Sequence, residues 1–250
     1  MRILVLTLSL LVSGLTLRAE KAQERLKEAT EVFNEIMATP DKGIPQDLLA
    51  KARCAVIVPG LKQAAFGVGG KYGAGFAFCR RNTGWGAPSA VKVEGGSVGF
   101  QIGASATDVV MLVMNERGMS RLLEDKFTLG AEASVAAGPV GRSTSALTDV
   151  QLGAEILSWS RSKGLFAGVA LSGATLRGDL DSNGELYSRK LGSKEILRGD
   201  LKPPAEALPL ISALNRYSPR EEKDKPIESR AADAVKDTQA DRPNTDRKKK

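Results

Sequence analysis

A glycine-rich stretch of alternating small and aromatic residues decides the fold: AAFGVGGKYGAGFAFCRR, residues 64–81. Glycines interleave here with larger apolar side chains such as Phe66, Tyr72 and Phe76. Glycine in a strand interior marks bends, bulges and places where another backbone approaches closely. The stretch therefore predicts strands that bend strongly.

The rest of the chain places this stretch in the middle of a β region with helical flanks. Of the 26 glycines, 19 lie between Gly67 and Gly173. Apolar runs predict strands at 54–58, closed by Pro59 and Gly60, and at 91–93, 97–104, 109–114, 154–159 and 165–171. Apolar residues at helical spacing, with capping residues and prolines, predict helices at 20–39, 45–52, 115–123, 185–191, 194–197 and 205–216. We expect one α+β domain over 20–218: a strongly bent, partly barrel-like antiparallel sheet with N-terminal and C-terminal helices.

The two ends of the chain differ from this domain. Residues 3–17 are dominated by Leu, Val and Ile, and Leu17-Arg18-Ala19 offers a cleavage site, which is typical of a secretory signal peptide over 1–19. The run is shorter than the roughly 20 residues of a spanning helix, although an uncleaved anchor is the alternative. Residues 219–250 hold ten Lys+Arg, eight Asp+Glu and no aromatic residue, which predicts a disordered charged tail. We expect an exported protein, periplasmic or extracellular, in peripheral association with a membrane.

The absence of histidine from the whole chain removes most hydrolytic chemistry. Residues 95–99 match the nucleophile elbow G-x-S-x-G, but that site needs a histidine. Residues 160–163 match S-x-x-K and lie in a predicted hairpin turn. Residues 67–72 lack the third glycine of a dinucleotide loop and the Ser/Thr of a phosphate-binding loop. We expect no enzyme activity and no cofactor.

The two cysteines and the acidic stretch at 179–184 each allow two interpretations. Cys54 and Cys79 lie at the ends of two predicted strands and, in an oxidising compartment, are a candidate disulfide; the alternative is two small buried residues. Two cysteines without histidine are too few for a structural zinc site. Asp179 to Gly184 reproduces the first half of a calcium loop, but Lys190 stands where the bidentate Glu belongs, so an Asx-rich turn is the alternative.

Basic residues recur at the edges of the glycine-rich strands. A shared rim of them would bind anionic headgroups with about 1 kcal/mol per residue, whereas isolated ones only aid solubility. Nucleic acid is not an expected partner, because base stacking needs several exposed aromatics and the chain has only 12. The candidate lipid-binding residues are Lys62, Lys71, Arg80, Arg81, Lys92 and Arg142.

Several motifs resemble those of the SYLF domain family across residues 26–217. They are GGSVGFQIG at 95–103, TDVV at 107–110 with Asn115, the segment 129–142, and Trp159 before KGLFAG at 163–168. The resemblance implies a lipid-binding module; eukaryotic members bind phosphoinositides, and some fungal ones bind and bundle actin. For an exported member we expect non-catalytic binding of anionic phospholipid at an envelope membrane. The alternative is an envelope scaffold or an actin-binding protein that works through protein contacts.

Overall fold

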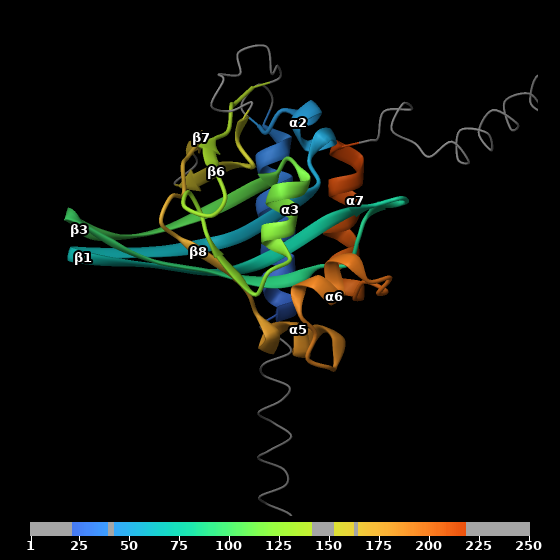
Figure 1. The fold of residues 1–250 in the computed structure, drawn as a ribbon. Helices are drawn as coiled ribbons and strands as arrows, with labels where there is room; N and C mark the ends of the chain where they lie inside the picture. The colour runs from blue at the N-terminus through green and yellow to red at the C-terminus, as the bar shows by residue number, and fades with distance from the viewer. Residues whose placement is uncertain (1–21, 40–42, 142–152, 163–164, 219–250) are drawn as a thin grey trace, which may run out of the picture.

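The computed structural model describes residues 22–39, 43–141, 153–162 and 165–218 (Figure 1). The predicted signal peptide, the predicted tail and Arg142 lie outside these residues. The described chain is an α+β domain, with one curled sheet of eight strands and helices from both ends of the sequence.

Two long strands form the centre of the sheet. β1 (Cys54–Arg81) and β3 (Ser89–Val113) are connected through the short β2 (Gly84–Trp85) and pair antiparallel along their length. The sequence predicted separate strands at 54–58 and 64–81. Instead, β1 continues through a register shift at Pro59 and Gly60, because Gly60 adopts a positive φ of 55° and its N–H donates to Asp108 Oδ1 at 2.9 Å.

The ribbon made by β1 and β3 folds back on itself. A second register shift lies between Phe66 and Val68, and beyond it the glycine-rich half of β1 returns past the first half. A Cβ at Gly75 would collide with the backbone of Ile57, and the Arg80 N–H donates to the Arg53 carbonyl oxygen at 2.8 Å. The prediction that glycine allows a close backbone approach is confirmed at Gly75.

Shorter strands extend the sheet on both sides of this ribbon. β6 (Ile156–Ser162) pairs with the second half of β3, and β5 (Val135–Ala137) and β7 (Leu165–Gly168) pair with β6. β8 (Thr175–Gly178) pairs with the first half of β3, and β4 (Lys126–Thr128) pairs with β8. The bent, partly barrel-like sheet is confirmed. Its pairs are antiparallel as predicted, with the exception of β5 and β6, which are parallel.

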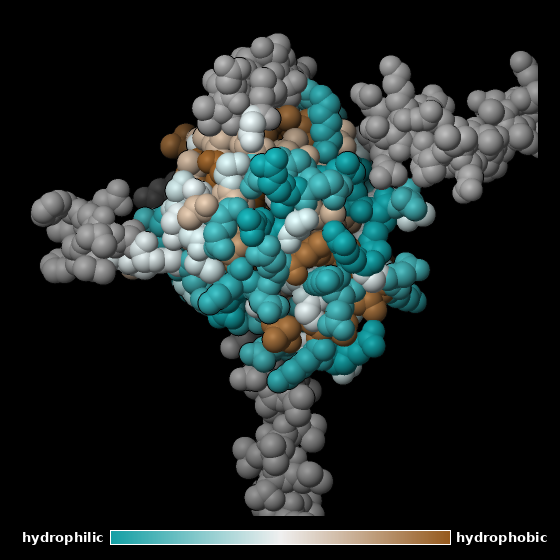
Figure 2. Space-filling model, viewed as in Figure 1, coloured by the Kyte–Doolittle hydropathy of each residue, from teal (hydrophilic) through white to brown (hydrophobic). Residues whose placement is uncertain are grey.

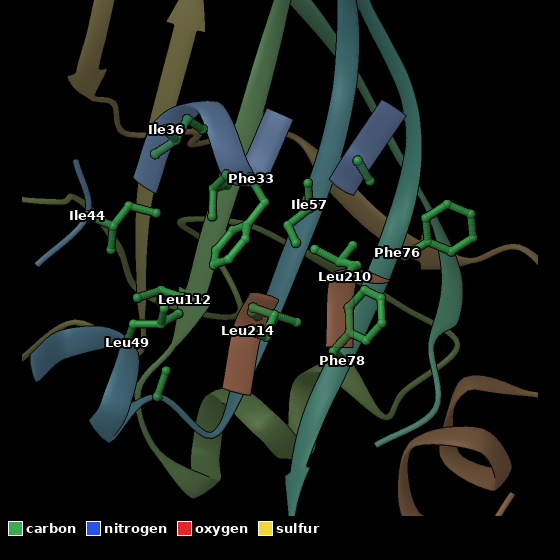
Figure 3. Close-up of a cluster of buried hydrophobic side chains, with 14 of the residues drawn as sticks. Phe33, Ile36, Ile44, Leu49, Ile57, Phe76, Phe78, Leu112, Leu210 and Leu214 are labelled. Carbon is green, nitrogen blue, oxygen red and sulfur yellow. The ribbon is translucent and has the colours of Figure 1, made fainter. Parts of the chain in front are cut away.

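Alternation along the strands separates the two large clusters of buried residues. One contains Ile57, Phe76 and Phe78 and is covered by the helix at 22–38, α2 (Gln46–Lys51), the 3-10 turn η1 (Ala205–Ala207) and α7 (Leu208–Tyr217) (Figure 3). The other contains Val56 and Val58 together with Leu122 of α3 (Glu116–Leu122) and Leu197 of α6 (Ser193–Arg198). Both faces of β1 are thus buried around Cys54 to Val58, because neighbouring side chains point to opposite sides of a strand.

One predicted helix boundary is wrong. The sequence placed a helix at 185–191, whereas α5 (Leu180–Tyr187) starts five residues earlier. Asp179 caps it: the carboxylate accepts from the Ser182 backbone N–H at 3.3 Å and from its hydroxyl at 2.8 Å. Of the two interpretations of residues 179–184, the structure favours the Asx turn, because the Asp179 carboxylate accepts from Ser182 at the start of a helix. Among the described residues, no three acidic or cysteine side chains gather as a metal site would require.

Candidate functional site

An open cleft of about 600 Å³ lies between the two halves of the folded ribbon. Three segments line it: Lys62 to Ala64 on the first half of β1, Gly70 to Tyr72 on its second half, and Ala104 to Ala106 on β3. The fold-back brings the first two segments together. Lys62 and Lys71, both predicted site residues, therefore line the same cleft.

Small residues in register with the lysines keep this cleft open. Lys62 pairs with Ala106 and Lys71 pairs with Gly95, so no bulky side chain stands opposite either lysine in the ladder. A Cβ at Gly70 would meet nothing closer than a backbone oxygen at 4.0 Å. Directly opposed strand residues are those whose side chains approach closely, so alanine and glycine at these positions leave room for a ligand.

The cleft is electropositive because its lysines have no opposite charge beside them. Lys62 is exposed and Lys71 is half-buried, and in the parts of the chain that the structure describes neither forms an ion pair. The carboxylate of Glu94, opposite Tyr72 in the ladder, is held by Arg177 at 2.7 Å. Hydrogen bonding to Arg177 lowers the pKa of Glu94 below its ordinary 4.5. Arg177 therefore neutralises Glu94, the acidic residue of β3 that is paired with Tyr72 of the cleft.

Polar and aromatic groups accompany the two lysines. The side chain of Tyr72 is 51% exposed at the edge of the cleft, and Gln63 and Ser105 add an amide and a hydroxyl. Tyrosine carries an apolar ring with a polar end, which suits the boundary between lipid and water. The arrangement can hold an anion next to an apolar surface.

Arg80 and Arg81, also predicted as lipid-binding, lie at the other end of β1 and contact the helices. Arg80 donates to the carbonyl oxygens of Leu49 and Ser218 at 3.0 Å and packs 4.6 Å from the Trp85 ring centre. Arg81 donates to carbonyl oxygens at the end of α6, among them that of Ile196 at 3.1 Å. Both guanidinium groups join the helical layer to the sheet.

Lys92 is also held by a protein partner. Its Nζ lies 2.8 Å from Oδ1 of Asp179, which is only 3% exposed. Burial by itself raises the pKa of Asp179, but hydrogen bonds from Lys92 and Ser182 outweigh it, so the pKa falls below 3.8. Of the six predicted lipid-binding residues, the structure thus brings together Lys62 and Lys71 alone among those it describes, and lipid contact by any of them stays a prediction.

An ion-pair network that the sequence did not reveal attaches the N-terminal helix to the sheet. Arg161 on β6 donates to Asp108 Oδ2 on β3 at 2.8 Å and also contacts Glu35 on the helix. Burial by itself lowers the pKa of Arg161, but its hydrogen bonds to these carboxylates raise it above its ordinary value. Glu35 and Arg161 are 126 residues apart, so no local pattern indicates the pair.

The disulfide between Cys54 and Cys79 is present and closes the ribbon at the end away from the cleft. Their Cα atoms are 4.0 Å apart, and the bond joins the start of β1 to its return. Of the two interpretations of the cysteines, the disulfide is confirmed. The loop that it closes contains the fold-back of β1 and both cleft lysines, Lys62 and Lys71.

The surface visible in Figure 2 is mainly hydrophilic. Among its coloured residues, apolar side chains appear in small separate areas, without a broad apolar face over the helices in view. Within the described ranges, no helix has the length and apolar character needed to cross a bilayer.

The sequence matches a family described as "Ysc84: Las17-binding protein actin regulator" over residues 94–217. SH3 domain-containing YSC84-like protein 1 of Rattus norvegicus is 33% identical over 212 residues, covering 84% of this chain and 62% of the relative. The Xenopus laevis protein of that name is 31% identical over 239 residues, covering 93% and 70%. LAS seventeen-binding protein 3 of Saccharomyces cerevisiae is 34% identical over 203 residues, covering 80% and 43%.

This chain therefore spans about three fifths of the length of the rat relative. The matching family is described as a protein-binding actin regulator and not as a family of enzymes. The match includes β8, α5, α6 and α7 and most of β3, and the longer alignments also reach the lysine-bearing β1. On the matched residues and on the similarity over nearly its whole length, the chain belongs to the Ysc84/SYLF domain family.

Proposed function

We propose that this protein binds anionic phospholipid non-catalytically, at an envelope membrane after export, through the cleft that Lys62 and Lys71 line. One observation carries the proposal. Two lysines nine positions apart in β1 share an open cleft without an ion-pair partner among the described residues, whereas Arg80, Arg81 and Lys92 contact protein groups. No catalytic step is assigned, because the chain lacks the histidine that most acid–base and metal chemistry would use.

The expected affinity is modest. At about 1 kcal/mol per lysine near an anionic surface, the two contribute about 2 kcal/mol, or about a thirtyfold gain in binding. Tyr72 adds an interfacial side chain beside them. Such a site holds a protein at the surface reversibly, and the binding weakens with salt because exposed charges are screened.

Vesicle co-sedimentation tests the proposal. We expect binding to vesicles of phosphatidylglycerol and phosphatidylcholine but not to phosphatidylcholine alone, and a fall of about tenfold or more in the variant Lys62→Gln/Lys71→Gln. The matched control Lys51→Gln/Lys126→Gln removes the same charge from exposed positions on α2 and β4. Equal loss in both variants, or no binding to the anionic vesicles, would contradict the assigned site.

A second candidate function follows from the relatives. The family description and the yeast relative both name Las17 binding, so the alternative is an envelope scaffold or an actin-binding protein that works through protein contacts. Co-sedimentation with filamentous actin, run beside the vesicle experiment, distinguishes the two. Pelleting with actin but not with anionic vesicles would favour the protein contact.

A further inference from the structure

A second groove lies between the N-terminal helix and the start of α7. Its volume is about 650 Å³, and it is lined by Gln23, Glu24, Lys27, Thr30, Glu31, Glu206 and Pro209. The two helices run side by side beyond it, since the rings of Phe33 and Tyr217 meet edge to face at 6.1 Å. Next to Pro209, the side chain of Leu208 is 51% exposed. The groove therefore has apolar surface within it and charged groups along its rim.

The rim is acidic and its charge is not balanced. Glu24, Glu31 and Glu206 face one cation, Lys27, which leaves a net charge of −2. All three carboxylates are exposed, and none forms an ion pair within the part of the chain that the structure describes. Such a rim fits a segment with closely spaced positive charges.

The chain itself contains such a segment, in Arg247–Lys250. Elsewhere between residues 219 and 246 acidic residues are interspersed with the basic ones, so these last four are the uninterrupted run of cations. α7 carries the chain from the groove at Pro209 to its end at Tyr217, about 12 Å at 1.5 Å per residue. Arg247 follows Ser218 by 29 positions in the sequence, and a coil of that length has a typical end-to-end distance of about 30 Å. The run can therefore reach back to the groove.

We propose that Arg247–Lys250 dock in the acidic groove of the same molecule. The tether gives these residues a local concentration in the millimolar range, so weak charge pairs suffice for occupancy. Docking withholds the basic run from anionic surfaces, and added salt releases it because the pairs are exposed. This proposal is independent of lipid binding at the Lys62–Lys71 cleft.

Backbone amide NMR of the full chain tests the docking. Replacing the run in the variant Arg247→Gln/Lys248→Gln/Lys249→Gln/Lys250→Gln is expected to shift amide signals at 23–31 and 206–208. The control Arg220→Gln/Lys223→Gln/Lys225→Gln/Arg230→Gln removes four tail cations outside the run and is expected to leave those signals in place. In a Glu24→Gln/Glu31→Gln/Glu206→Gln background, the terminal substitutions should no longer shift them.

Two outcomes would overturn the proposal. One is that the terminal and the control substitutions change the groove signals equally, or that neither does. The other comes from carbodiimide cross-linking of a mixture of ¹⁴N and ¹⁵N chains: cross-links that join the isotopes and increase with concentration would assign the groove to a second copy. Cross-links from Lys248–Lys250 to the groove glutamates within single chains would support docking.

Discussion

The two ends of the folded β1–β3 ribbon contain similar residues and differ in what covers them. Both have glycine and basic residues. At the disulfide end, helices and turns receive the arginine side chains, and Gly75 packs against Ile57. At the other end, Lys62 and Lys71 border an open cleft. The comparison shows that a basic side chain on this sheet binds protein groups where a helix or turn places a carbonyl or carboxylate oxygen beside it. Where no such oxygen lies beside it, the side chain is left accessible.

The largest expected effect is at Gly75. Gly75→Ala places a Cβ in collision with the Ile57 carbonyl and 2.7 Å from Val58 Cα, so we expect a loss of about 3 kcal/mol or more in the free energy of unfolding. Gly70→Ala, at the open end, should cost less than about 1 kcal/mol. Urea unfolding compares the two. Equal losses would show that the two ends are packed alike.

Removing the disulfide should come next in size. Cys54→Ala/Cys79→Ala opens a loop with a sequence separation of 25, which corresponds to about 3 kcal/mol in the chain-entropy account. Because the bond lies away from the cleft, we expect vesicle binding below the melting temperature to be unchanged. Loss of binding by a variant that is still folded would mean that the disulfide also shapes the cleft.

Substitutions of Arg80 and Lys62 should have opposite effects on stability and on vesicle binding. Arg80→Met removes donors to the carbonyls of Leu49, Ala52 and Ser218 and should lower the free energy of unfolding by about 2 kcal/mol. Lys62→Met should change it by less than about 0.5 kcal/mol while weakening vesicle binding. Denaturation and co-sedimentation of both variants check this reversal. The same stability loss in both would remove the distinction between the two ends.

The smallest effect is the pH dependence at the Lys92–Asp179 pair. The folded state lowers the pKa of Asp179 below 3.8, so its stabilisation is complete above the unfolded pKa and is lost as pH falls through the folded pKa. Asp179→Asn should therefore cost about 1 to 2 kcal/mol near pH 7 and progressively less below about pH 4. Asp181→Asn, an exposed neighbour on α5, is the control and should show little change. A deficit for Asp179→Asn that does not shrink in acid would contradict the ion pair's role.

Local patterns predicted the elements whose signals are local. Apolar spacing predicted the helix at 20–39, observed at 22–38, and Asn115 caps α3 as expected, accepting from the Gly118 N–H at 2.9 Å. The glycine-rich stretch correctly indicated bending. It did not show where the bend falls, because its glycines are spread over 67–75 while the register shift lies at 66–68.

The sequence could not predict which of the basic residues form the candidate site, because contacts with residues far away in the sequence decide which of them are held by the protein. Arg80 contacts Ser218, 138 residues away, and Arg81 contacts Ile196, 115 residues away. Nothing near either arginine in the sequence distinguishes it from Lys62. Only the position of the bend decides that Lys62 and Lys71 share a cleft.

At the second register shift, the two strands of the ribbon use different numbers of residues to pass the bend. Between paired positions, β1 advances from Phe66 to Val68 while β3 advances from Val98 to Ile102, so β3 uses two more residues to make the same turn. β3 therefore takes the longer path through the bend. Deleting two residues from β3 between 98 and 102 would equalise the paths and separate Lys62 from Lys71 without altering either lysine.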